Sequence, residues 1–173
     1  MRLFCGLLCL VFWVSPTHAD DPVDRLAAAM ANRLQVMTEV AHYKWQHGIA
    51  VDAPEREASV IAATVDKALT LGLDRHVATR AVTAQMDAAK MLQRSLIASW
   101  QTGPTPERDA PDLAQNIRPR INQLTTAFLQ ALKDAQPLLE NCHTPERPAH
   151  IDAAIWQTAV SGTVPLRCGA SAD

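Results

Sequence analysis

The sequence is poor in the residues and patterns that build sheets and nucleic-acid surfaces. Only 5% of its 173 residues are aromatic, and no stretch alternates convincingly between apolar and polar residues. Strands are rich in aromatic and β-branched residues at a period of two, so this composition disfavours a sheet. The formal net charge is −2 and no run of basic residues occurs, which argues against nucleic acid as a partner.

The parts of conventional catalytic sites are missing as well. The sequence has no glycine-rich phosphate loop, its histidines lack the spacing of metal ligands, and no serine stands in a recognisable nucleophile motif. The sequence therefore lacks the usual motifs for acid–base, metal-dependent and nucleophilic catalysis.

One long apolar run is present, and it lies at the N-terminus. A short basic start, Met1-Arg2, precedes the apolar residues 3–14, and Ala19 offers a small residue for cleavage. This pattern predicts a secretory signal peptide over residues 1–19. A membrane anchor is the rival interpretation, but the run is shorter than the ~20 residues that a spanning helix needs. We therefore expect a periplasmic or secreted protein with no membrane attachment after cleavage.

Cleavage would leave two cysteines, Cys142 and Cys168. An exported chain with one cysteine pair favours a disulfide over two free thiols. Such a bond would contribute about 3 kcal/mol in the chain-entropy model. The roughly 154 residues that remain are enough for one domain with a sizeable core.

Apolar residues recur at three- and four-residue steps through the rest of the chain, which predicts an all-α fold. We expect helices over about 22–45, 54–71, 75–100 and 112–139, with a short helix near 148–161. Asp52 and Asp74 are expected as N-caps, Gly72 as a C-terminal cap, and Pro119 either kinks the fourth helix or marks its true start. Residues 20–140 would form the helical bundle, and 141–173 a C-terminal extension tied by the disulfide.

Two cations lie beside the apolar stripe of the first helix. Arg33 and Lys44 are eleven residues apart, almost three helical turns, so they project from one side about 16 Å apart. A pair of this kind can grip a small dianionic ligand. Taken alone, either one is an ordinary surface residue whose stem covers apolar surface.

Further polar residues occupy places that an ordinary helix does not require. Gln93 falls on the buried side of the third helix, although a satisfied core amide is the simple alternative. Arg56 lies in the first turn of the second helix, where a cation opposes the helix dipole, while Glu57 beside it complements that dipole. Arg118, next to Pro119, completes the set.

The order and spacing of these residues resemble the exported, all-helical chorismate mutases, the secreted (gamma) branch of that family. The resemblance covers about residues 23–128. It is carried by four blocks: Arg33 with Lys44-Trp45, then Pro54-Glu55-Arg56-Glu57, residues 85–93 ending in Gln93, and residues 112–121 around Arg118.

The resemblance implies an isomerase that converts chorismate to prephenate by a pericyclic rearrangement without a cofactor. Such an enzyme holds a dianion in a compact conformer and stabilises negative charge on the ether oxygen. By resemblance, Lys44 and Gln93 would contact that oxygen, Arg33 and Arg118 the carboxylates, Arg56 would be a further cationic contact, and Glu57 would accept from the ring hydroxyl. Arg33, Lys44 and Gln93 would be the catalytic residues.

The chain departs from the family pattern at two positions. Ala89 stands where the family often has serine or threonine, and Ala53 where it often has a carboxylate. The resemblance further implies a homodimer in which each active site is built within one chain. The alternative function is a non-catalytic exported helical protein that binds a small dicarboxylate or a partner protein.

Overall fold

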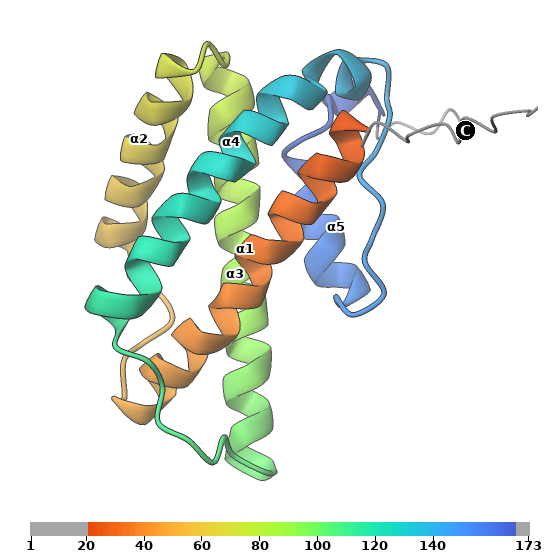
Figure 1. Ribbon diagram of the computed structural model, residues 1–173. Helices are drawn as coiled ribbons and strands as arrows, with labels where there is room; N and C mark the ends of the chain where they lie inside the picture. The colour runs from red at the N-terminus through yellow and green to blue at the C-terminus, as the bar shows by residue number, and fades with distance from the viewer. Residues whose placement is uncertain (1–20, 169–173) are drawn as a thin grey trace, which may run out of the picture.

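The computed structural model describes residues 21–168, and the elements assigned there are all helical (Figure 1). The main helices are α1 (Pro22–Gln46), α2 (Pro54–Thr70), α3 (Arg75–Thr102), α4 (Arg118–Glu140) and α5 (Ala153–Ser161). A π-helical turn, Leu113–Ile117, precedes α4, and a 3₁₀ turn, Leu166–Cys168, follows α5. The all-α prediction is confirmed. The predicted signal peptide lies outside the described residues.

Several helix ends follow from single residues. The Asp74 carboxylate accepts hydrogen bonds from the backbone N–H groups of His76 (2.8 Å) and Val77 (3.1 Å), as expected of the N-cap of α3. Gly72 ends α2 with φ of +82°, a left-handed backbone that glycine adopts without steric cost. Pro119 stands in the first turn of α4, so the interpretation that it marks the true start of this helix is confirmed.

Two expectations about the elements were wrong. The N-cap of α2 is Ala53, not Asp52, because the Asp52 carboxylate pairs with Arg94 on α3. The short last helix begins at Ala153 and not near residue 148, because Asp152 caps it there.

The helices surround a core that runs along α1. α1 packs against both α4 and α3, α2 covers α3 on one side, and α5 covers it on the other (Figure 1). The largest fully buried side chains include Leu26, Met30, Leu34 and Phe128. Burial of each such side chain contributes about 1.5–3 kcal/mol. Farther along α1 lies a separate group, here called the small apolar cluster: Val36, Met37, Val40, Ala89 and Ile117.

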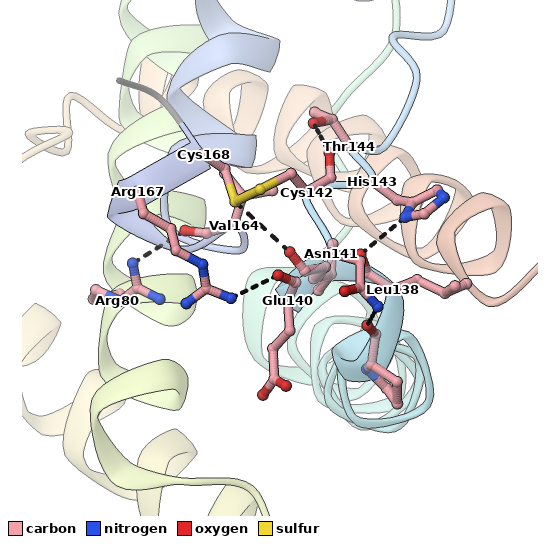
Figure 2. The surroundings of a disulfide bond; sticks show 12 residues. Arg80, Leu138, Glu140, Asn141, Cys142, His143, Thr144, Val164, Arg167 and Cys168 are labelled. Carbon is pink, nitrogen blue, oxygen red and sulfur yellow. Dashed lines mark hydrogen bonds between the residues drawn. A yellow bond between two sulfur atoms is a disulfide. The ribbon is translucent and has the colours of Figure 1, made fainter. Parts of the chain in front are cut away.

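The segment after α4 is fastened to the bundle. Figure 2 shows the predicted disulfide between Cys142 and Cys168, whose Cα atoms are 5.4 Å apart. Beside it, the Arg167 guanidinium donates to the Glu140 carbonyl (2.6 Å), and Arg80 of α3 donates to the Val164 carbonyl (3.1 Å). The disulfide prediction is confirmed, and α5 is held against α3. None of the helices described here is long and apolar enough to span a membrane.

Candidate active site

Three of the six predicted site residues, Arg33, Gln93 and Arg118, lie beside residues of the small apolar cluster. On α1, Arg33, Met37, Val40 and Lys44 follow one another at steps of four, three and four, so they share a side of the helix. Met37 and Val40 are 7% and 6% exposed. Arg33 and Lys44 therefore lie at the two ends of a buried apolar strip.

Arg33 turns toward α4. One of its terminal nitrogens donates to the Thr125 hydroxyl, and the guanidinium carbon lies 5.5 Å from the centroid of the Phe128 ring. Burial lowers the pKa of Arg33 to about 10, so the group stays charged at neutral pH. Its buried Nε has no hydrogen-bond partner among residues 21–168. Thr125 was not anticipated from the sequence.

Gln93 of α3 faces α1 across the cluster. Its side chain is 4% exposed, and its amide nitrogen contacts the Met37 sulfur at 3.7 Å. A thioether is a weak acceptor, so this contact satisfies the amide poorly. The Gln93 Oε1 atom has no partner within the described part of the chain. The predicted burial of Gln93 is confirmed, and the satisfied core amide is not what the structure contains.

Arg118 occupies the first position of α4, directly after Ile117, which is a buried member of the cluster. The residue is partly buried, and its Nε is shielded from solvent without a hydrogen-bond partner in the region from 21 to 168. Ala89, the departure from the family pattern on α3, is buried in the same cluster. Two guanidinium groups, from α1 and α4, thus carry unsatisfied buried donors.

Lys44 stands at the far end of the strip, near the start of α2. Its Nζ donates to the Val51 carbonyl at 2.9 Å. Burial lowers the pKa of the Lys44 ammonium below its usual value, and the nearby charge of Glu57 partly offsets this by raising it. Arg33 and Lys44 each bond to a different neighbour, Thr125 and Val51 respectively.

Glu57 is held from two sides in the first turn of α2. One carboxylate oxygen accepts the Ala53 backbone N–H at 2.8 Å, and the other accepts from Lys90 of α3 at 2.9 Å. These bonds, first that from Ala53 and then that from Lys90, lower the pKa of Glu57. Arg56, beside it, is exposed.

Lys90 was missed by the sequence reasoning. A cation three residues before Gln93 was visible in the sequence, but its partner lies 33 positions away on another helix. Ion pairs between helices leave no periodic signal in one sequence. The structure thus brings Arg33, Gln93 and Arg118 to one cluster, and Lys44 and Glu57 to its far end.

Two surface grooves are present, and Val36 of the small apolar cluster lines the first of them. One of about 310 Å³ runs between α1 and α4, and another of about 610 Å³ lies beside α5; none of the six predicted site residues lines either groove. Within residues 21–168, no group of three or more His, Cys, Asp or Glu side chains is placed to hold a metal ion.

Known chorismate mutases are similar to this chain. Residues 21–94 match the family model described as chorismate mutase type II. The chain is 31% identical over 146 residues to a secreted chorismate mutase of Mycolicibacterium smegmatis, covering 83% of this chain and 78% of that protein. It is 34% identical over 110 residues to a monofunctional chorismate mutase of Enterobacter agglomerans, covering 62% and 61%.

A solved structure agrees with these sequence matches. The crystal structure of a chorismate mutase from Burkholderia thailandensis aligns with a TM-score of 0.73 at 29% identity, covering 83% of this chain and 99% of that one. Identity at this level over most of both chains, with the same helical architecture, is shared ancestry and not chance likeness. This chain belongs to the type II, helical chorismate mutase family.

Proposed function

We propose that this protein converts chorismate to prephenate, with the small apolar cluster as the floor of its active site. The observation that carries the proposal is the pair of partly buried arginines, Arg33 and Arg118, whose buried Nε atoms have no hydrogen-bond partner within the described residues. A buried donor without an acceptor costs about 1–3 kcal/mol, more when it is charged. A ligand with two carboxylates removes both penalties, and bidentate guanidinium–carboxylate pairing suits this role.

Lys44 and Gln93 supply the electrostatic part of the mechanism. The rearrangement breaks the ether C–O bond while a new C–C bond forms, and negative charge builds on the ether oxygen in the transition state. We propose that the Lys44 ammonium and the Gln93 amide N–H donate to that oxygen as its charge grows. Bound substrate replaces two weak or exchangeable partners, the Val51 carbonyl and the Met37 sulfur.

This division of labour needs no proton transfer and no covalent intermediate. Fixed donors in a buried site stabilise developing charge without reorganisation. A millionfold acceleration corresponds to lowering the activation free energy by about 8 kcal/mol. A few such donors, together with a substrate held in its reactive conformer, can supply this. Arg56 would be a further cationic contact, and Glu57 would accept from the ring hydroxyl while it stays bound to Ala53 and Lys90.

The test is chorismate consumption by residues 20–173 without added metal or cofactor. We expect conversion to prephenate by the wild-type chain and a loss of at least about hundredfold in kcat for Lys44→Ala, because one preorganised donor of this kind contributes that much. Folded wild-type protein without turnover would contradict the proposal. Chorismate binding in that case would favour a non-catalytic protein that binds a small dicarboxylate. The two departures from the family pattern, Ala53 and Ala89, are consistent with that alternative.

Export and assembly form a second part of the proposal. The relative from M. smegmatis is named a secreted chorismate mutase. We propose that residues 1–19 are removed on export and that the mature protein is a homodimer with each site within one chain. Expression of the full chain in a bacterium with a periplasm, followed by mass determination, should give a product beginning at Asp20. Sedimentation of that product should give twice the chain mass.

A further inference from the structure

Two carboxylates, Glu57 and Asp52, lie close enough to Lys44 to raise its pKa. Each of them pairs with a cation on α3. Glu57 is bound by Lys90 through a 2.9 Å contact, and Asp52 is bound by Arg94. Lys90 and Arg94 are one helical turn apart on α3, and Gln93 lies between them in the sequence. The side chain that is proposed to contact the ether oxygen is thus flanked by two cations that face the loop and first turn of α2.

The two pairs differ in burial. The side chains of Lys90 and Glu57 are each 18% exposed, whereas those of Arg94 and Asp52 are 51% and 53% exposed. Exposed ion pairs contribute little because water and salt screen them, while screening falls as burial increases. The Lys90–Glu57 pair is therefore the one whose loss redistributes charge inside the site.

The position of the Glu57 carboxylate is defined at both oxygens. Ala53 N–H binds one oxygen at 2.8 Å and Lys90 binds the other. Lys44 donates instead to a neutral acceptor, the Val51 carbonyl. Lys90 also lies 3.3 Å from Asp87, one turn earlier on its own helix, which fixes the direction of its stem. The arrangement gives the carboxylate to Lys90 and leaves the Lys44 ammonium without a direct ion pair in the described residues.

We propose that Lys90 is a positioning residue that binds Glu57 and thereby keeps the charge of Lys44 available for substrate. Without Lys90, the half-buried carboxylate of Glu57 has an unpaired charge, and Lys44 is the ammonium that its charge already affects. A Lys44–Glu57 ion pair would neutralise the donor that the reaction needs. This inference rests on the proposed function, because the effect is measured as a change in the kcat of the proposed reaction.

The experiment compares Lys90→Met in two backgrounds. In the wild-type background we expect kcat to fall by about tenfold or more with little change in KM, because Lys44 stabilises charge that appears in the transition state. In a Glu57→Gln background we expect Lys90→Met to cause no further loss, because no carboxylate remains to neutralise Lys44. Lys90→Arg, which keeps the cation, should retain nearly wild-type kcat.

The matched control is Arg75→Met, which removes another contact between an α3 cation and an α2 carboxylate. That pair, Arg75–Asp66, is 3.9 Å long and exposed, and it lies near the start of α3. Its loss should leave kcat unchanged. Thermal melts of each variant show that it is folded, and Lys90→Gln takes the place of Lys90→Met if the latter does not fold.

Two results would overturn the inference while leaving the proposed function intact. One is a Lys90→Met enzyme with wild-type kcat. The other is an equal loss of kcat in the wild-type and Glu57→Gln backgrounds, which is the signature of a merely structural role. Absence of turnover in the wild-type chain would instead overturn the proposed function, and this inference with it.

Discussion

Gln93, which we propose donates to the ether oxygen, is an amide, and an amide does not titrate. It can donate to an oxygen at any pH, whereas a glutamate in its place must first be protonated. Lys44 does titrate, and its pKa is lowered chiefly by burial. Only its protonated form is charged, so activity should persist through neutral pH and fall as the pH rises through the lowered pKa of Lys44.

Gln93→Glu should change the shape of that profile. A buried carboxyl has a raised pKa, and only its neutral form donates a hydrogen bond. We therefore expect kcat/KM of the variant to fall by at least about tenfold between pH 5 and pH 8, because the donor and its charge-assisted contribution are lost over this range. The wild-type rate should stay nearly level. The measurement is a pH–rate profile of both enzymes.

Gln157→Glu is the matched control, because it makes the same chemical change at an exposed position of α5. Its profile should follow that of the wild type. A Gln93→Glu profile that also followed the wild type would show that residue 93 does not donate to the reacting oxygen.

At the scale of the elements, local signals in the sequence predicted the helices well and the contacts between them poorly. Asp74 and Gly72 act on their own backbone within a few residues, so their capping roles were predictable. Asp52 also looked like a cap, but a partner on α3 binds its carboxylate instead. The same limit hid Lys90 as the partner of Glu57.

The contact between α5 and α3 depends on a glycine. A Cβ atom at Gly162 would lie 2.2 Å from the Arg80 carbonyl oxygen and 2.6 Å from the Ala84 Cβ. A backbone carbonyl oxygen and the Cβ of an alanine cannot move aside without shifting the helix backbone. Gly162→Ala should therefore lower the free energy of unfolding by about 1–3 kcal/mol, the usual range for overpacking.

Denaturant unfolding followed by helical circular dichroism measures this loss. Gly48→Asn is a suitable comparison, because a Cβ at position 48 meets nothing within 4 Å and asparagine tolerates the φ of +62°. It should change stability by less than 1 kcal/mol, the small cost of a compatible turn residue. Equal losses in the two variants would contradict a tight α5–α3 contact.

On the scale of the whole molecule, composition and periodicity were enough for the fold class, and the family blocks supplied the site residues that we propose. The direction of each side chain was not contained in them. Arg33 and Lys44 share a phase on α1, yet the first bonds to α4 and the second to the loop before α2. Side-chain partners of this kind depend on how the helices pack, which one sequence does not record.

The disulfide acts on stability at this same scale. Its cysteines are separated by 26 positions, for which the chain-entropy model gives about 3 kcal/mol. Replacement of both cysteines by serine should lower the free energy of unfolding by roughly that amount. It should leave kcat unchanged, because neither cysteine belongs to the small apolar cluster. Denaturant titrations with and without a thiol reductant give the measurement.

The wild-type chain under reducing conditions should match the serine variant. A wild-type transition that reductant does not move would show that the bond contributes nothing to stability.

The place of this bond along the chain also fixes when it can form. Cys168 follows all five main helices, so the pair cannot close until the whole bundle has been synthesised. Helices form in microseconds, while disulfides form in seconds to hours. The disulfide therefore forms last, after the helices have formed and packed, and it stabilises a bundle that is already assembled.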